Sequence, residues 1–258
     1  MTRHARLRTA ASALRYMTRT PPRLGWCPTC SGNTVFVAVG DWLREDLKCA
    51  RCRSSSRQRA ISDYLTRCFA DLETLKVYEP SPSRPSLRYF EQAGAQYTWS
   101  VYSLETRRPA EAGVLIENLE SLTFSDEAFD LAVSQDVLEH INDPRRAFAE
   151  ISRILGPGGS HLFTVPWYPD RPTQRRAERR GGRMHHFGPP EYHADPFDDN
   201  GSLVFTRFGA DIGKIIEECS GMKTEIIRAQ DSRQGIQGDS IVLFHSVKPD
   251  IEAGEASA

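Results

Sequence analysis

Short apolar runs alternate with helical patterns between Leu75 and Val165, and this alternation is the strongest constraint on the fold. Strands are predicted at residues 75–79, 97–102, 114–116, 130–134 and 161–165. Helices are predicted at 86–93 and 144–155, and the second has Pro144 in its first turn and Gly156 past its end. Strands separated by helices pair in parallel through right-handed crossovers, so the sequence predicts an α/β fold with a mostly parallel sheet.

The regular pattern stops after Pro166. Residues 167–206 are rich in arginine and contain His185, His186 and His193, with no clear period. Such a segment predicts a lid or substrate loop, and disorder is the alternative. A helix at 208–219 and strands at 224–228 and 241–247 follow, and the two strands can close the sheet as an antiparallel pair.

Four of the six cysteines form two pairs, Cys27-x2-Cys30 and Cys49-x2-Cys52. This spacing predicts a tetrahedral Zn²⁺ site of four thiolates. Two disulfides are the alternative, but no apolar stretch typical of a secretory signal is found. A strand predicted at 34–39 between the pairs makes the module resemble a zinc ribbon, and a helix at 57–72 follows. Cys68 and Cys219, which stand alone in helical patterns, are predicted to be buried.

Charge is distributed unevenly along the chain. Residues 1–60 carry 12 Lys and Arg against 3 acids, a balance of +9, and the remaining residues therefore carry −10 of the total of −1. A basic arm is typical of proteins that bind nucleic acid or anionic lipid, of targeting segments, and of solvated extensions. No apolar run approaches the ~18–20 residues of a membrane span, so we expect a soluble, cytoplasmic protein.

One segment carries a family resemblance. Residues 121–166, "SLTFSDEAFDLAVSQDVLEHINDPRRAFAEISRILGPGGSHLFTVP", resemble the second half of the cofactor domain in class I S-adenosylmethionine methyltransferases of the type 11 branch. The four-cysteine ribbon and the segment "PPEYHADPFDDNGSLVFTRFGADI" resemble a subgroup linked to sugars and polysaccharides. The resemblance implies a Rossmann-like seven-stranded sheet in the order 3-2-1-4-5-7-6, with strand seven antiparallel, and S-adenosylmethionine as cofactor.

These observations together predict five parts. A basic extension (1–24) precedes the zinc ribbon (25–56) and a linker helix (57–73). The methyltransferase domain (74–248) contains the lid (167–206), and a tail (249–258) ends the chain. The ribbon can stabilise its own fold, support a homodimer or cover the acceptor site, and the sequence leaves these roles open.

The expected cofactor loop, "VYEPSPSRPS" at 77–86, has no glycine. The resemblance implies that Glu79 binds the cofactor's ammonium group and that Ser81, Ser83 and Pro85 stand where glycines would be. The Ser81 and Ser83 hydroxyls and the Arg84 guanidinium can hold the cofactor's carboxylate instead. Asn118, Leu119, Ser134 and Gln135 match further cofactor-binding positions of the family. Val101 replaces the acidic residue that would accept the ribose hydroxyls, and Tyr102 lies beside it. The departures from the family pattern leave a cofactor-free binding protein as an alternative.

The resemblance places His140, in "DVLEHI", near the active-site mouth, where a general base would take the proton of an alcohol acceptor. A histidine bonded to backbone is the alternative, and Glu139 can orient the imidazole or serve the structure alone. His186 and the other lid histidines are further candidate bases. Asp195, Asp198 and Glu191 can form a Mg²⁺ site with sugar hydroxyls or a series of turns.

Three functions follow from these patterns. The favoured one is O-methylation of a sugar, oligosaccharide or polysaccharide precursor. An RNA methyltransferase that uses the zinc module to bind RNA is the second, and a non-catalytic binding protein is the third.

Overall fold

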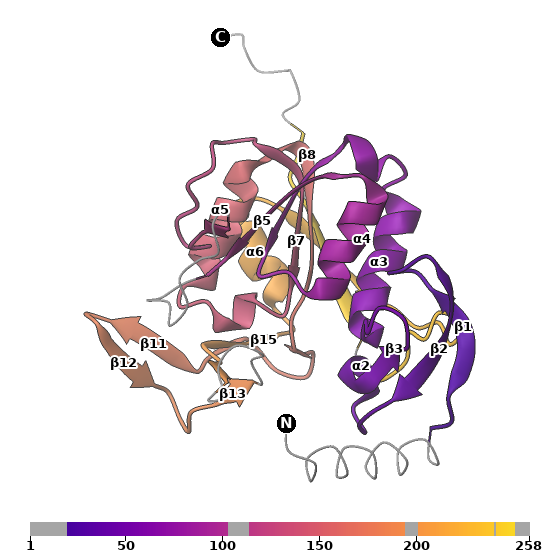
Figure 1. The fold of residues 1–258 in the computed structure, drawn as a ribbon. Helices are drawn as coiled ribbons and strands as arrows, with labels where there is room; N and C mark the ends of the chain where they lie inside the picture. Colours follow the sequence, from indigo (N-terminus) through magenta and orange to yellow (C-terminus); the bar gives the residue numbers. More distant parts are fainter. Residues whose placement is uncertain (1–19, 103–113, 194–200, 240, 251–258) are drawn as a thin grey trace. The chain divides into compact units, whose positions relative to one another are not determined.

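The computed structural model describes residues 20–102, 114–193, 201–239 and 241–250 (Figure 1). Asp195 and Asp198 lie outside these ranges. The chain divides into two compact units. The first contains residues up to Thr74 together with Ser83–Ala95 and Ile227–Leu243, and the second contains Leu75–Pro82, Gln96–Ile226 and the residues from Phe244 onward.

A three-stranded antiparallel sheet begins the first unit, with the order β1 (Arg23–Cys27), β2 (Gly32–Ala38) and β3 (Leu47–Cys49). A single turn of helix, α2 (Leu43–Asp46), connects β2 to β3. The strand predicted at 34–39 is present as β2. The apolar core of this sheet is small, with Phe36, Ala38 and Leu47 beside the four cysteines.

Helix α3 (Ser56–Cys68) follows the sheet and begins with a capping box. Ser55 Oγ accepts from the Gln58 amide at 3.4 Å, and the Gln58 side chain accepts from the Ser55 amide at 2.9 Å, so two amides of the first turn are satisfied. The helix ends four residues before the predicted boundary, and a 3-10 turn, η1 (Leu72–Thr74), follows. Helix α4 (Arg84–Ala93) packs beside α3 in the same unit (Figure 1).

Seven strands form the main sheet: β4 (Lys76–Pro80), β5 (Gln96–Val101), β6 (Leu115–Ile116), β7 (Phe129–Gln135), β8 (Leu155–Thr164), β16 (Lys223–Arg228) and β17 (Val242–Val247). Their order is β6-β5-β4-β7-β8-β17-β16. The first five in sequence pair in parallel, and β17 is antiparallel to β8. Counted along the chain as one to seven, the strands read 3-2-1-4-5-7-6. The predicted fold class, a Rossmann-like class I methyltransferase sheet, is confirmed.

The elements between these strands complete the second unit. A 3-10 turn, η2 (Leu138–His140), follows β7. Helix α5 (Pro144–Ile154) is capped by Asp143, whose carboxylate accepts from the Arg146 amide, and it packs against α6 (Ile212–Ser220) (Figure 1). The sheet core contains the fully buried Leu131, Phe163 and Phe244.

Three expectations from the sequence need correction. Cys68 is exposed, because it is the last residue of α3, and Cys219 is only partly buried. The predicted helix at 208–219 begins later, because Phe208 lies in a strand, β15 (Thr206–Gly209), that pairs in parallel with β9 (Trp167–Tyr168). The described part of 167–206 is a series of short strands rather than irregular chain.

These short strands are β10 (Gln174–Arg175), β11 (Ala177–Arg180), β12 (Arg183–His186), β13 (Tyr192–His193) and β14 (Ser202–Leu203). Strands β11 and β12 form a hairpin whose two-residue turn is Gly181-Gly182, with φ angles of 57° and 75°. Consecutive positive φ angles are what a tight hairpin requires, and a Gly-Gly pair adopts them readily. Among the described residues, no helix has the length and apolar character to cross a bilayer.

Candidate functional site

The four paired cysteines converge in the first unit. Cys27 Sγ lies 3.7 Å from Cys52 Sγ, and Cys30 Sγ lies 3.9 Å from Cys49 Sγ. All four sulfurs lie within 4.8 Å of one another, and all four cysteines are free thiols. Contact among the sulfurs raises the pKa of Cys27 and lowers the pKa of Cys49 within a mostly buried cluster.

A fully buried arginine lies beside this cluster. Arg59, on α3, donates to the carbonyl oxygens of Leu47 at 2.9 Å and Gly235 at 2.6 Å, and also to the carbonyl of Ser54. Its guanidinium carbon lies 4.5 Å from the centre of the Phe36 ring. Burial lowers the pKa of Arg59 to about 10, and the cysteine sulfurs oppose this shift. The guanidinium therefore places a positive charge beside the thiol cluster.

The second unit holds the other predicted residues, at the carboxyl ends of its strands. The chain leaves β4 in one direction for β5 and β6 and returns on the other side at β7, so the strand order reverses between β4 and β7. Open α/β sheets bind their ligands at such a reversal point. Glu79 on β4 and Gln135 on β7 meet there.

Glu79 is 1% exposed, and both of its carboxylate oxygens accept hydrogen bonds. Gln135 Nε2 donates to Oε1 at 3.0 Å, and the Tyr97 hydroxyl donates to Oε2 at 2.7 Å. Two predicted residues are thus brought together, and Tyr97 is an addition that the sequence reasoning missed. Its position on β5, parallel to β4, is the signal that could have identified it, because Tyr97 and Glu79 lie on neighbouring strands.

A serine takes the left-handed conformation directly after β4, in the loop that lacks glycine. Ser81 has a φ of 50°, in the left-handed region, and its amide donates to the Ser100 carbonyl at 2.7 Å. Asp136, directly after β7, has a φ of 54°, and its carboxylate accepts from the Thr164 hydroxyl at 2.8 Å. Non-glycine residues in this region store strain and concentrate at functional sites. Both strands at the reversal point therefore end in a strained residue.

Ser83 and Arg84 occupy the start of α4 in the first unit. Ser83 is the N-cap, and its hydroxyl accepts from the Ser86 amide at 3.3 Å and from Gln58 Nε2 at 2.9 Å. Arg84 is exposed. The Ser83 hydroxyl is thus engaged in capping its own helix.

The remaining predicted cofactor residues have different surroundings. Ser134 is buried in β7, and its hydroxyl lies 3.0 Å from Nε2 of the fully buried His161. Asn118 bonds through Oδ1 to the Glu120 amide at 3.0 Å, and Leu119 is buried. Tyr102 is 44% exposed. Partial burial raises its pKa, and the nearby Arg179 acts in the opposite direction.

Glu139 and His140 lie in η2, and β13 brings His193 to them. Glu139 Oε1 lies 3.7 Å from His140 Nε2 and 3.6 Å from His193 Nδ1. The two imidazole rings are nearly perpendicular, with their centres 5.1 Å apart. His140 Nδ1 lies 2.8 Å from the Leu203 carbonyl, so that nitrogen is the donor and Nε2 carries the lone pair. Contact with Glu139 raises the pKa of His193 although burial opposes this.

The family comparison agrees with this architecture. Residues 64–163 match the family described as "Methyltransferase domain". The matched residues include β4, β5, β7 and η2, and hence Glu79, Gln135 and His140.

Curated relatives share parts of this domain. An uncharacterised protein of Mycobacterium tuberculosis (strain H37Rv) is 30% identical over 128 residues, which are 50% of this chain and 41% of that protein. A malonyl-[acyl-carrier protein] O-methyltransferase of Pseudescherichia vulneris is 29% identical over 114 residues, 42% of this chain and 45% of that protein. The chain thus spans less than half the length of these relatives.

Solved structures are similar at lower identity. An S-adenosylmethionine dependent methyltransferase from Mesorhizobium loti is 17% identical and aligns with 73% of this chain and 98% of that one, with a TM-score of 0.47. A Burkholderia thailandensis 1,6-didemethyltoxoflavin-N1-methyltransferase with bound S-adenosylhomocysteine is 14% identical, with coverage of 76% and 79% and a TM-score of 0.44.

His186, the further candidate base, is exposed at the end of β12 and lies opposite Ala177 in the hairpin. Among the described histidines of the 167–206 segment, only His193 joins Glu139 and His140. The cluster therefore combines residues of the matched methyltransferase domain with one residue outside it.

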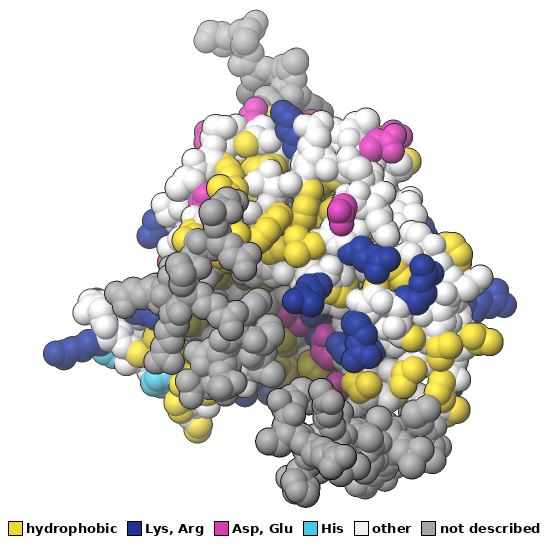
Figure 2. Space-filling view, in the orientation of Figure 1, with side chains coloured by type: hydrophobic (Ala, Val, Ile, Leu, Met, Phe, Trp, Pro, Cys, Tyr) yellow, Lys and Arg dark blue, Asp and Glu magenta, His cyan; other side chains and the backbone are white. Residues whose placement is uncertain are grey.

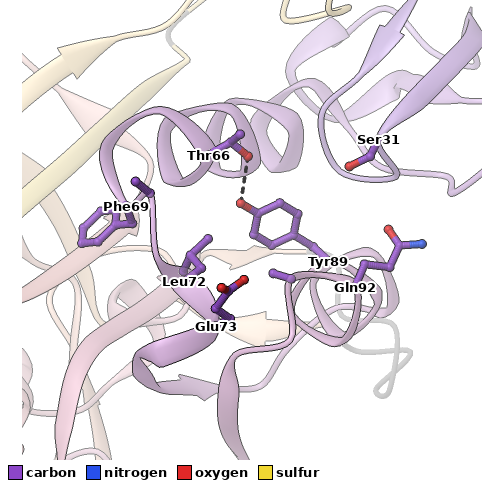
Figure 3. Close-up of a pocket in the computed structure, with 9 residues that line it drawn as sticks. Ser31, Thr66, Phe69, Leu72, Glu73, Tyr89 and Gln92 are labelled. Atoms are coloured by element: carbon purple, nitrogen blue, oxygen red, sulfur yellow. Dashed lines mark hydrogen bonds between the residues drawn. The ribbon is translucent and has the colours of Figure 1, made fainter.

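A cavity of about 230 Å³ lies in the first unit, between α3, η1 and α4 (Figure 3). Thr66 and Tyr89 point toward each other across it, with 3.0 Å between their hydroxyl oxygens. Its other lining residues include Phe69, Leu72 and Glu73. None of the predicted cofactor-binding residues lines it.

Proposed function

We propose that the chain is an S-adenosylmethionine-dependent methyltransferase that methylates a hydroxyl group of a sugar or oligosaccharide. The observation that carries the proposal is the buried Glu79 carboxylate, bonded to Gln135 across the point where the strand order reverses. A carboxylate there attracts the ammonium group of the methionine moiety. The match of residues 64–163 to the methyltransferase family supports the same reading.

The residues at this point suit the cofactor although glycine is absent. Ser81 adopts the left-handed conformation that glycine would otherwise supply, so the backbone can turn sharply after β4. Hydrogen bonds from Tyr97 and Gln135 hold the Glu79 carboxylate at the reversal point, where its negative charge can attract an ammonium group. Bound S-adenosylmethionine supplies an electrophilic methyl group on a sulfonium.

His140 is the proposed base. As the acceptor oxygen bonds to the methyl carbon and the sulfur–carbon bond breaks, the acceptor proton moves to His140 Nε2. The Leu203 carbonyl fixes the tautomer that leaves this nitrogen unprotonated, and the Glu139 carboxylate 3.7 Å away stabilises the imidazolium that forms. A hydroxyl acceptor is favoured because an alcohol must lose its proton during transfer.

A sugar is favoured among hydroxyl acceptors for two reasons. The family resemblance points to carbohydrate pathways, and the 167–206 segment exposes Phe187 and Tyr192 by 53% and 54%. Exposed aromatic faces provide flat apolar surfaces against which sugar rings can stack.

The test separates cofactor binding from turnover. Calorimetric titration should detect S-adenosylmethionine binding to wild type and to His140→Ala with similar Kd values. Methyl transfer to a mixed sugar pool, followed by mass spectrometry, should fall by about 10²–10⁴-fold in the variant. His185→Ala, an exposed histidine on β12, is the matched control. Absence of S-adenosylmethionine binding would refute the proposed function. Unchanged turnover in His140→Ala would show that His140 is not the base.

We also propose that the four cysteines hold a structural Zn²⁺ ion. A tetrahedral ion with Zn–S bonds of ~2.3 Å separates its sulfurs by ~3.8 Å, and the two measured separations of 3.7 and 3.9 Å fit this value. Four protein ligands leave no open position, as expected of a structural site. One equivalent of zinc in the purified protein, lost in Cys49→Ser, is the expected result; zinc-free protein with unchanged stability would overturn it.

RNA remains the second candidate acceptor, favoured by one observation. Lys and Arg side chains gather on the face drawn in Figure 2, over the region of α3 and α4. Phosphate contacts by such side chains give an affinity that falls steeply with salt. Filter-binding at 50 and 200 mM salt should show this fall if RNA is the substrate, and absence of RNA binding at low salt would exclude it.

A further inference from the structure

Glu139 is a buried carboxylate without a hydrogen-bond donor. Its side chain is 1% exposed, and neither oxygen has a hydrogen-bond partner among the described residues. A buried, unpaired carboxylate costs several kcal/mol unless it is protonated, paired or bound to a cation. Of the basic side chains that the structure describes, His140 and His193 lie within 4 Å of it.

The orientation of the two rings explains why His140 does not satisfy the carboxylate. His140 Nδ1 donates to the Leu203 carbonyl, so in the neutral ring Nε2 presents a lone pair toward Glu139. On the other side, His193 Nδ1 faces Glu139, and His193 Nε2 lies 3.8 Å from Glu191 Oε1. A proton on Nε2, directed at Glu191, leaves the lone pair of His193 on Nδ1. Three electron-rich atoms then converge with no hydrogen between them.

The separations of these atoms fit a shared metal ion. An ion bound at ~2.1 Å in tetrahedral geometry separates its ligand atoms by ~3.4 Å. The measured separations of 3.6 and 3.7 Å from Glu139 Oε1 need a closure of only a few tenths of an ångström. All three ligand atoms lie within 4.8 Å of one another.

The surroundings resemble the outer shell of a metal site. A metal-bound histidine usually donates its second nitrogen to a carbonyl or carboxylate, and here Leu203 O and Glu191 stand in those places. Two arginines lie against Glu191 rather than Glu139: Arg207 Nε donates to Glu191 Oε2 at 2.7 Å, and Arg176 Nε lies 3.9 Å from the same oxygen. The Thr206 hydroxyl, 3% exposed, also lacks a partner among the described residues and lines the same small pocket as Glu139 and His193.

We propose that Glu139, His140 and His193 form a binding site for a divalent transition-metal ion, separate from the four-cysteine cluster. Two imidazoles and one carboxylate favour ions such as Zn²⁺ or Fe²⁺ over Mg²⁺ and Ca²⁺, which prefer ligand sets made of oxygen. Three protein ligands leave a position open for water or for an oxygen of a small ligand.

The site shares one atom with the proposed reaction. His140 Nε2 binds either the ion or the acceptor proton, so an ion at this site occupies the base and lowers methyl transfer. The metal site itself rests on the three side chains and does not depend on the proposed function. A protein that binds the ion but methylates nothing would keep this inference and refute only the function.

The test counts ions. Protein whose cysteine site is already filled with Zn²⁺ is titrated with Zn²⁺ in a calorimeter and with Co²⁺ in a visible spectrometer. One further equivalent should bind, and Glu139→Gln and His193→Gln should each weaken this binding at least about tenfold. His185→Gln, which removes an exposed histidine of β12, should bind the ion as wild type does.

The outcomes are distinct. Absence of a further equivalent, or equal affinity in Glu139→Gln and wild type, overturns the proposal. Circular dichroism shows whether Glu139→Gln folds, and His193→Gln, at a position whose side chain is 32% exposed, provides the second variant if it does not. Nuclear magnetic resonance of the histidines tests the alternative arrangement. A His193 imidazolium that pairs with Glu139 and does not respond to Zn²⁺ would also overturn the proposal.

Discussion

Replacement of Arg59 by methionine tests how the cysteine module is stabilised. The side chain is fully buried and donates to the carbonyl oxygens of Leu47, Ser54 and Gly235. Arg59→Met retains much of the volume but removes the guanidinium from all three carbonyls, of which Ser54 keeps the Cys49 amide and Gly235 keeps the Ser56 hydroxyl as donor. It also removes the positive charge beside the cysteines.

The expected loss of stability follows from these contacts. A hydrogen bond from a charged group contributes about 1.5–3 kcal/mol, and removal of one partner from a buried charge pair costs about 3–5 kcal/mol. These figures overlap, so we expect about 3–5 kcal/mol in total, or a fall in Tm of roughly 10 °C. Zinc affinity should fall as well, because the ion with four thiolates carries a net charge of −2 that the guanidinium offsets.

Urea unfolding and competition with a zinc chelator measure the two effects separately. Arg67→Met is the matched control, since Arg67 is 60% exposed, forms an i,i+4 pair with Asp63 worth about 0.3–0.5 kcal/mol, and lies 5.8 Å from the centre of the Tyr64 ring. Arg59→Lys keeps the charge but not the planar fork, so it should recover zinc affinity better than stability. Equal unfolding midpoints for Arg59→Met and Arg67→Met would refute the reasoning.

The remaining predictions concern acid stability, packing and cofactor affinity. Burial lowers the pKa of His161 to about 3, so below its ordinary value of 6.5 the unfolded chain binds a proton that the folded chain does not. Stability should therefore fall by about 1.4 kcal/mol for each pH unit below about 6, and urea unfolding of His161→Asn should show a shallower pH dependence; identical slopes would contradict this. Gly235 has a φ of 64°, and a Cβ there would lie 2.7 Å from the Phe36 ring, so Gly235→Ala should cost about 1–3 kcal/mol in thermal unfolding. No loss beyond that of Gly221→Ala, where φ is 71° and nothing lies within 4 Å, would argue against the clash. Glu79→Gln should weaken S-adenosylmethionine binding by about 10–100-fold in calorimetry, whereas Glu91→Gln, at an exposed position, should not. Equal affinities of the two variants would show that Glu79 does not bind the cofactor.

The sequence predicted those features that depend on neighbouring residues. Apolar runs of strand length separated by helical stripes predicted the parallel sheet and its class, because each element buries one face according to its own period. The two Cys-x2-Cys pairs predicted their own convergence, because each pair lies on one tight turn and the strand between them returns the chain. The Gly181-Gly182 hairpin was equally local, but its turn signal was missed within an arginine-rich segment.

Only the tertiary structure decided which distant side chains meet. His193 joins Glu139 across 54 positions of sequence, and no period or spacing within either segment encodes that contact. In the same way, Arg59 belongs to a polar stretch of α3, yet its guanidinium is buried because carbonyls of β3 and of residue 235 converge on it. Local pattern fixes the backbone elements, since their energetics are set within a few residues. The partners of a buried charge depend on how those elements pack, and that is settled only when the whole chain has folded.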